Sequence, residues 1–138
     1  MNEWLQKTAK QHQDKDLART YIAATPEKPQ EIIGFFSLLA TAISTEGMAG
    51  TKLPLEVSAG LLGRLAVDHR FFGKGIGEHL LLAAFDIVLK ISEAIGLQCI
   101  VVDAIDARAV TFYEKYGFES LTDRPNRLFL PMATLKQA

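Results

Sequence analysis

The sequence has too few cysteines to form a disulfide bond within the chain. Its 138 residues include one cysteine, Cys99, so neither an intrachain disulfide nor a multi-thiolate metal site can form. Cys99 lies in the apolar run Gln98–Val102, where we expect a buried and inert thiol rather than a reactive one. We therefore predict a fold held together by its core, without a multi-thiolate metal site, and we also expect no metal cofactor.

An excess of charge of one sign is also missing. Lys and Arg number 15 and Asp and Glu number 16, so the formal net charge is −1, which is a poor basis for a protein that mainly coats nucleic acid. The segment Met1–Lys10 contains no apolar signal sequence. Charged residues such as Asp86 and Lys90 interrupt the longest apolar stretches too early for a membrane span. These absences predict a soluble, cytoplasmic protein without membrane contact.

Apolar residues are abundant, at 49% of the chain, which is enough for a sizeable core. Their pattern predicts a helix at Asn2–Gln13, followed by an antiparallel hairpin of strands Ala18–Ala24 and Glu31–Ile43. The segment Thr25–Pro29 contains two prolines and is predicted as the turn between them. The segment Ser44–Leu55 is interrupted by glycine and proline and is predicted as a loop.

The second half of the chain alternates between buried strands and helices. The long helix of this half has Gly96 as its expected C-terminal cap. The predicted elements are a strand at Leu61–Val67, a helix at Ile76–Ile95, a strand at Gln98–Ala104, a helix from Asp106 to Gly117 and a strand at Arg127–Met132. This order predicts one mixed α/β domain over residues 1–138, with a crossover at its centre.

A glycine-rich run joins the central strand to the long helix. It reads D-H-R-F-F-G-K-G-I-G from Asp68 to Gly77. Glycines at alternate positions let successive amides turn inward, and the following helix adds unpaired N–H groups and a positive dipole end. Such a turn suits a pyrophosphate, with Arg70 and Lys74 beside it. The spacing departs from the dinucleotide pattern G-x-G-x-x-G and from the P-loop, and a plain turn before a helix remains an alternative.

A second motif, D-A-R-A-V-T-F-Y-E-K-Y-G-F, runs from Asp106 to Phe118. Together the two segments resemble the hallmarks of the GNAT superfamily of N-acetyltransferases. The run from Arg70 to Gly75 is similar to that family's pyrophosphate loop, [QR]-x-x-G-x-[GA], and the second motif is similar to its helix closing with F-Y-x-x-x-G-F. Asp106 departs from the family's common asparagine and is expected to be a helix N-cap.

The resemblance implies a mixed sheet that splays between its two central strands to admit acetyl-CoA. Tyr113 would protonate the departing sulfur, while Phe112 and Phe118 are expected core aromatics. Backbone groups of β-strand residues would pair with the pantetheine arm, and the amide of Leu65 or Ala66 would hold the thioester carbonyl. The implied cofactor-binding residues are Leu65, Ala66, Val67, Arg70, Phe72, Gly73, Lys74, Gly75, Ile76 and Gly77.

Short phrases over nearly the whole chain, such as G-R-L-A-V-D from Gly63 to Asp68, resemble the GNAT-type toxins of bacterial toxin–antitoxin modules. That resemblance implies acetylation of the α-amine of aminoacyl-tRNA, a ribbon-helix-helix antitoxin and a homodimer. It also implies a strand and a helix before the equivalent of Asn2, and we expect both to be missing here. The alternatives are a small-molecule or protein N-terminal amine as acceptor, which the net charge favours, and a non-catalytic acyl-CoA-binding partner protein.

Two expectations concern the acceptor. An α-amine with a pKa near 8 is partly neutral at physiological pH, so water can serve as the base, and Asp68, His69 and Glu46 are only loosely placed candidates. Arg64 is a charge within an apolar strand. It is expected either to contact a substrate phosphate or carboxylate, or to pair with an acidic neighbour at the sheet edge.

Overall fold

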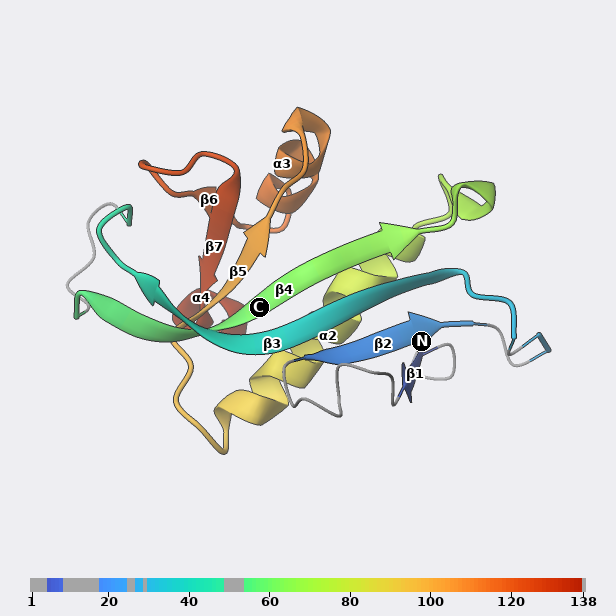
Figure 1. Ribbon diagram of the computed structural model, residues 1–138, viewed down its shortest axis with the longest axis horizontal. Coiled ribbons are helices and arrows are strands. Elements are labelled where there is room, and N and C mark those ends of the chain that lie inside the picture. The colour runs from blue at the N-terminus through green and yellow to red at the C-terminus, as the bar shows by residue number, and fades with distance from the viewer. Residues whose placement is uncertain (1–4, 9–17, 25–26, 29, 49–53, 138) are drawn as a thin grey trace. The chain divides into compact units, whose positions relative to one another are not determined.

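The structure is a computed structural model that describes residues 5–8, 18–24, 27–28, 30–48 and 54–137. A mixed sheet carries the helices, as predicted (Figure 1). Its strands are β1 (Leu5–Thr8), β2 (Arg19–Ala23), β3 (Gly34–Ser44), β4 (Glu56–Val67), β5 (Cys99–Asp103), β6 (Glu119–Ser120) and β7 (Arg127–Pro131). The helices are the 3₁₀ helix η2 (His69–Phe71) and the α-helices α2 (Ile76–Ser92), α3 (Ala107–Glu114) and α4 (Met132–Lys136).

The strands are hydrogen-bonded in the order β1-β2-β3-β4-β5-β7-β6. The chain divides into two compact units, of which the first comprises Met1–Leu39 and Leu62–Ile87. The second comprises Ala40–Leu61 and Val88–Ala138. Strands β3 and β4 are long enough to contribute residues to both. No helix in the described part of the chain is long and apolar enough to cross a membrane.

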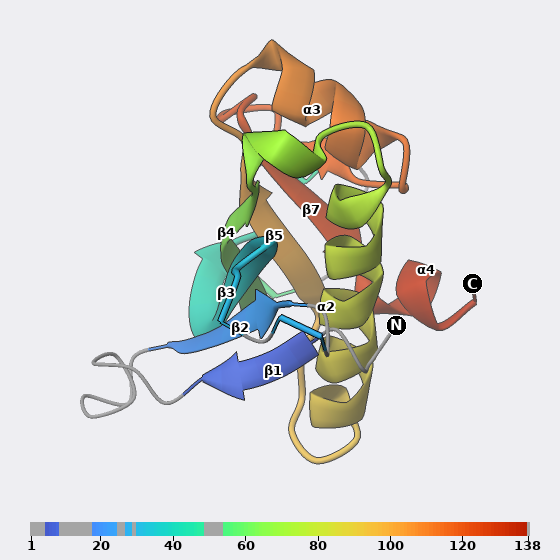
Figure 2. The ribbon, with the colours of Figure 1, turned by 90° about the vertical axis from the view of Figure 1, so that its right-hand side faces the viewer.

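The first unit contains the predicted hairpin. Strand β2 pairs antiparallel with β3, and β1 pairs antiparallel with β2 (Figure 2). The Tyr21 and Phe36 rings stack across β2 and β3, with centroids 5.0 Å apart. Phe36 is fully buried, so this pair anchors the register of the two strands.

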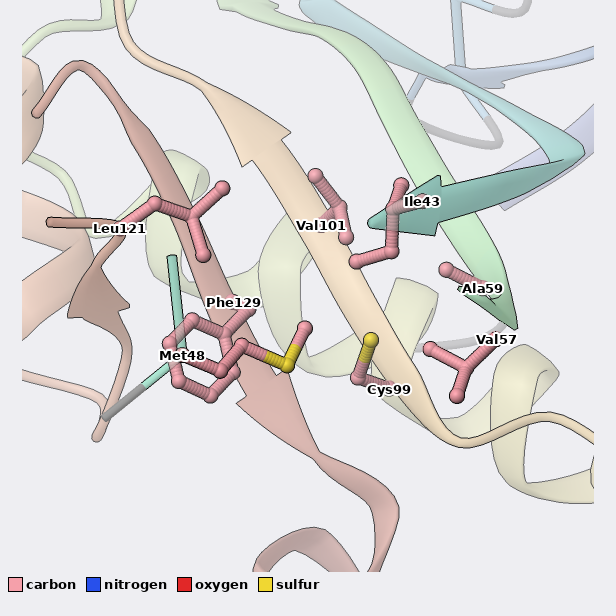
Figure 3. Close-up of a cluster of buried hydrophobic side chains, with 8 residues drawn as sticks. All are labelled: Ile43, Met48, Val57, Ala59, Cys99, Val101, Leu121 and Phe129. Carbon is pink, nitrogen blue, oxygen red and sulfur yellow. The ribbon is translucent and has the colours of Figure 1, made fainter. Parts of the chain in front are cut away.

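The second unit has its own apolar core (Figure 3). Side chains from β3, β4, β5 and β7 meet there, together with two loop residues. The cluster comprises Ile43, Met48, Val57, Ala59, Cys99, Val101, Leu121 and Phe129. Cys99 is 2% exposed, and burial raises the pKa of its thiol to about 11. These observations agree with the expected inert thiol, because the thiolate is the reactive form.

The prediction of a helix at Asn2–Gln13 is wrong where the structure describes that segment. Leu5–Thr8 form strand β1, paired with β2 from Leu5↔Ala23 to Thr8↔Thr20. The apolar spacing suits a helix, but backbone pairing with an available strand edge overrides a local preference of this size. The rest of that predicted helix, and most of the predicted turn at Thr25–Pro29, lie outside the described residues.

Two boundaries also differ from the prediction. Helix α2 ends at Ser92, and Gly96 does not adopt the positive φ of a C-terminal cap. Strand β4 begins at Glu56, five residues before the predicted start, and its first four residues alternate between exposed (Glu56, Ser58) and buried (Val57, Ala59). The small residues of this segment conceal its alternation in the sequence. Strand β6 and helix α4 were not predicted.

Gly34 lies at a close approach between β3 and β4. A Cβ at Gly34 would lie 2.7 Å from the Ala66 carbonyl oxygen and 3.0 Å from Leu80 Cδ1. We therefore expect Gly34→Ala to lower the free energy of unfolding by about 1–3 kcal/mol, because backbone must move to admit the methyl group. Gly60→Ala is the matched control, since its nearest atom would be Val88 Cγ2 at 3.7 Å, an ordinary contact. Urea unfolding of both variants measures the difference, and equal midpoints would contradict this reading of Gly34.

Candidate active site

The glycine-rich run forms a tight turn between β4 and α2. Strand β4 ends at Val67, and the Asp68 side chain caps the 3₁₀ helix η2 by accepting from the Arg70 N–H at 2.9 Å. Helix α2 then begins at Ile76 (Figure 1). The Asp68 amide donates to the Ile33 carbonyl at 2.7 Å, which ties the start of the turn to the segment before β3.

Two glycines of this turn adopt backbone conformations that other residues avoid. Gly73 has φ +80° and Gly75 has φ +75°. A Cβ at either position would meet no heavy atom within 4 Å. Glycine is therefore required at these positions by the backbone angle and not by crowding.

The turn also contains five successive backbone amides without a hydrogen-bond acceptor in the described structure. The N–H groups from Gly73 through Gly77 donate to no acceptor in the segments that the structure describes. The Phe72 amide differs, because it donates to the His69 carbonyl at 3.2 Å and so serves the turn itself. Phe72 as a residue is 67% exposed. A group of amides at the start of an α-helix is suited to an anion.

The arginine of the turn is held by a carboxylate two residues away. Arg70 Nε and Nη2 donate to the two Asp68 carboxylate oxygens at 3.1 and 3.0 Å. These side-chain bonds, with the bond from the Arg70 amide, lower the pKa of Asp68 to about 2. A carboxylate with this pKa is a weak base. Its imidazole neighbour His69 has a side chain that is 85% exposed, with Nδ1 3.7 Å from Asp68 Oδ1.

Phe71 is a residue of this turn that the sequence analysis did not single out. Arg70 Cζ lies 5.6 Å and Lys74 Nζ 5.5 Å from the centroid of its ring. Both cations of the turn therefore contact one half-buried aromatic ring. The sequence carries a signal for this contact, because Phe71 directly follows Arg70 and stands three residues before Lys74.

The end of β4 carries the remaining predicted residues of this unit. Leu65 and Val67 are half-buried, and Ala66 is exposed. Arg64 is exposed as well, so the charge is not buried within the strand. It forms no ion pair with any acidic residue in the described ranges, whereas the pairing alternative expected one. Its guanidinium is available to a ligand.

Tyr113 lies on α3 in the second unit, apart in sequence from the turn. Its residue is 7% exposed, and burial raises the pKa of its phenol to about 12. The rings of Phe112 and Phe118 pack edge-on against it, with centroids at 5.2 and 5.4 Å. Asp106 caps this helix as expected, because its Oδ1 accepts from the Ala109 N–H at 2.8 Å. Gly117, with φ +97°, follows the helix.

The predicted cofactor-binding residues and Arg64 thus belong to the first unit, while Tyr113 belongs to the second. In the first unit, the turn combines five available amides, two cations and an exposed aromatic side chain. In the second unit, an apolar environment keeps a phenol protonated. These are the parts that an acyltransferase needs for a phosphate-bearing thioester.

Comparison with known proteins places the chain in that class. The family model of the GNAT acetyltransferase domain matches residues 16–120. The chain therefore belongs to the GNAT family of acetyltransferases and is an N-acetyltransferase.

Two curated relatives are similar over almost the whole chain. The tRNA-acetylating toxin of Mycobacterium tuberculosis is 29% identical over 135 residues, covering 96% of this chain and 80% of that protein. The probable toxin TacT of Sinorhizobium fredii is 27% identical over 148 residues, covering 99% of this chain and 81% of that protein.

Several solved structures are also similar to this chain. The toxin AtaT in complex with acetyl-methionyl-tRNAfMet has a TM-score of 0.85 and 28% identity, covering 92% of this chain and 78% of that chain. A tyrosine-to-phenylalanine variant of KacT has a TM-score of 0.83 and 26% identity, covering 91% and 78%. AtaTR bound to acetyl-CoA has a TM-score of 0.78 and 27% identity, covering 92% and 77%.

Proposed function

We propose that this N-acetyltransferase uses acetyl-CoA to acetylate the α-amine of aminoacyl-tRNA, as the toxin of a toxin–antitoxin module. The observation that carries the cofactor assignment is the set of five available amides from Gly73 to Gly77. With Arg70 and Lys74 beside them, they offer hydrogen-bond donors and positive charge to the diphosphate of coenzyme A. The acetyl-CoA complex of AtaTR supports the same cosubstrate.

Acetyl transfer makes an N–C bond and breaks a C–S bond. The amine attacks the thioester carbonyl, water takes the amine proton, and the sulfur leaves with the bonding electrons. The Tyr113 phenol donates its proton to that sulfur. An apolar environment raises the pKa of the departing coenzyme A thiol as well as that of the phenol. The pKa values of the proton donor and of the leaving group therefore rise together. An amide of Leu65 or Ala66 stabilises the carbonyl oxygen, and Asp68, already paired with Arg70, takes no part as a base.

The raised pKa of Tyr113 sets the expected alkaline limit of the reaction. The acid must be protonated, so activity is retained below the pKa of the folded protein and lost as pH rises through about 12. An ordinary phenol would lose its proton near pH 10. We expect turnover at saturating substrate to show no falling limb between about pH 8 and 10.5, provided that circular dichroism confirms the fold over that range. A decline centred near pH 10 would contradict this role.

The assignment of aminoacyl-tRNA as acceptor rests on the relatives. One curated relative is a tRNA-acetylating toxin, the other is a probable toxin, and AtaT has been solved with acetyl-methionyl-tRNAfMet. The exposed guanidinium of Arg64 is suited to a phosphate of such a substrate. AtaT has also been solved with the C-terminus of the antitoxin AtaR. We infer a ribbon-helix-helix antitoxin, a homodimer and a cytoplasmic location, where charged tRNA is available.

The net charge of −1 favours a second candidate, a small-molecule or protein N-terminal amine, because affinity for RNA depends strongly on phosphate contacts. Cell-free translation with purified protein separates the two. The tRNA hypothesis predicts arrest that requires acetyl-CoA, together with N-acetylated aminoacyl-tRNA detected by mass spectrometry. Unimpaired translation with acetyl transfer to other amines would favour the second candidate. Binding of acetyl-CoA without transfer to any amine would identify a non-catalytic binding protein.

A further inference from the structure

We propose that Phe71 is a positioning residue that holds both cations of the turn, Arg70 and Lys74, at the coenzyme A diphosphate. The inference rests on the proposed function, because it assigns that diphosphate to the turn. It adds a residue whose side chain bears no charge and no hydrogen-bonding group. Its evidence is the pair of ring contacts at 5.6 and 5.5 Å.

The Phe71 backbone is held within η2. The Phe71 amide donates to the Asp68 carbonyl at 2.8 Å within η2, and the side chain is half-buried. The electron-rich face of such a ring attracts a cation placed within about 6 Å of its centroid. The Phe71 ring is therefore a partly buried aromatic surface that both cationic side chains contact.

The two cations depend on this ring to different degrees. Arg70 is also held by two bonds from its guanidinium to Asp68, so it keeps an anchor if the ring is removed. Lys74 lies between the two positive-φ glycines, and its contact with Phe71 is the one that fixes its ammonium group within the described structure. A free lysine side chain loses rotamer entropy when it is ordered. The ring lowers that cost before the ligand arrives, so Lys74 is the cation through which Phe71 mainly acts.

The test compares Phe71→Leu with Phe71→Tyr, using the full-length protein. Leucine keeps an apolar side chain without the ring's quadrupole, and tyrosine restores an aromatic face. We expect Phe71→Leu to raise the KM for acetyl-CoA by about 2- to 6-fold, the effect of losing the one partly exposed cation–π contact to Lys74 while Asp68 still holds Arg70, with kcat nearly unchanged. Phe71→Tyr should retain the wild-type KM. A KM for Phe71→Leu equal to that of the wild type would overturn the proposal.

Acetyl-pantetheine, which carries the thioester but no phosphate, separates positioning from general damage. The value of kcat/KM for this substrate should be equal in the wild type and Phe71→Leu. A parallel loss with both substrates would show that the leucine merely disturbs the fold. Phe35→Leu is the matched control, because Phe35 is also half-buried in the first unit and lies outside the binding turn. Phe35→Leu should leave kcat/KM unchanged for both acetyl-CoA and acetyl-pantetheine.

A double-mutant cycle with Lys74→Met tests the route of the effect. If Phe71 acts mainly through Lys74, most of the increase in KM caused by Phe71→Leu should disappear in the Lys74→Met background. Full additivity of the two substitutions would overturn this coupling. The proposed function fails separately, because it requires wild-type protein to bind acetyl-CoA more tightly than acetyl-pantetheine. If wild-type protein shows that preference and Phe71→Leu keeps it in full, only the role of Phe71 is wrong.

Discussion

Tyr113→Phe should reduce acetyl turnover by roughly 10²- to 10⁴-fold while leaving the affinity for acetyl-CoA near that of the wild type. The substitution removes one hydroxyl from a buried side chain and keeps the ring that packs against Phe112 and Phe118. The sulfur would then leave as an unprotonated thiolate in apolar surroundings, where a charge is poorly solvated. Single-turnover kinetics and isothermal titration with acetyl-CoA measure the two quantities separately.

Tyr116→Phe provides the matched control for the loss of a hydroxyl. Tyr116 lies three residues further along the chain, is half-buried, and packs against Phe112 with ring centroids 5.3 Å apart. Its variant should keep turnover within a few-fold of the wild type. Full activity of Tyr113→Phe would show that another group or water protonates the sulfur. An equal loss in both variants would point to disturbed packing around Phe112.

Gly75→Glu should weaken acetyl-CoA binding by on the order of 100-fold or more. A residue with a Cβ is strained at φ +75°, at a cost of about 1–2 kcal/mol. The carboxylate adds repulsion toward the diphosphate, which is worth a few kcal/mol at short range near a protein surface. Because a Cβ at Gly75 would meet no heavy atom within 4 Å, the cost to the fold should be limited to this backbone strain. Titration calorimetry measures the affinity, and thermal unfolding reports on the fold.

Two further variants divide that effect into its causes. Gly75→Gln carries the same backbone strain without the charge, and we expect it to weaken binding by roughly 10-fold. Gly96→Glu places the carboxylate at a glycine that has open space around it and no positive φ, and it should leave the affinity unchanged. Equal affinities of Gly75→Glu and the wild type would remove the phosphate role of the turn.

Several elements could be predicted because their signals are local and strong. The hairpin of β2 and β3 follows two apolar runs separated by a proline-containing segment, and the α3 cap follows from Asp106 placed three residues before Ala109. The segment Leu5–Thr8 was misassigned, because its strand state depends on pairing with β2 and not on its own periodicity. The true end of α2 also escaped prediction, since Gly96 has the residue type of a cap without its conformation.

The sequence by itself determined the family and the turn. Residue type and spacing alone specify the chemistry. The residues concerned are the glycines at 73 and 75, the cations before and after Gly73, and the second motif downstream, which contains the aromatic residues. Tertiary structure decided which atoms are available. Folding commits the Phe72 amide to η2, pairs Arg70 with Asp68 and places the Phe71 ring against Lys74. It also buries Tyr113, which raises the pKa of its phenol to about 12. Burial and side-chain rotamers depend on neighbours that only the packed chain brings together, so spacing along the chain cannot fix them.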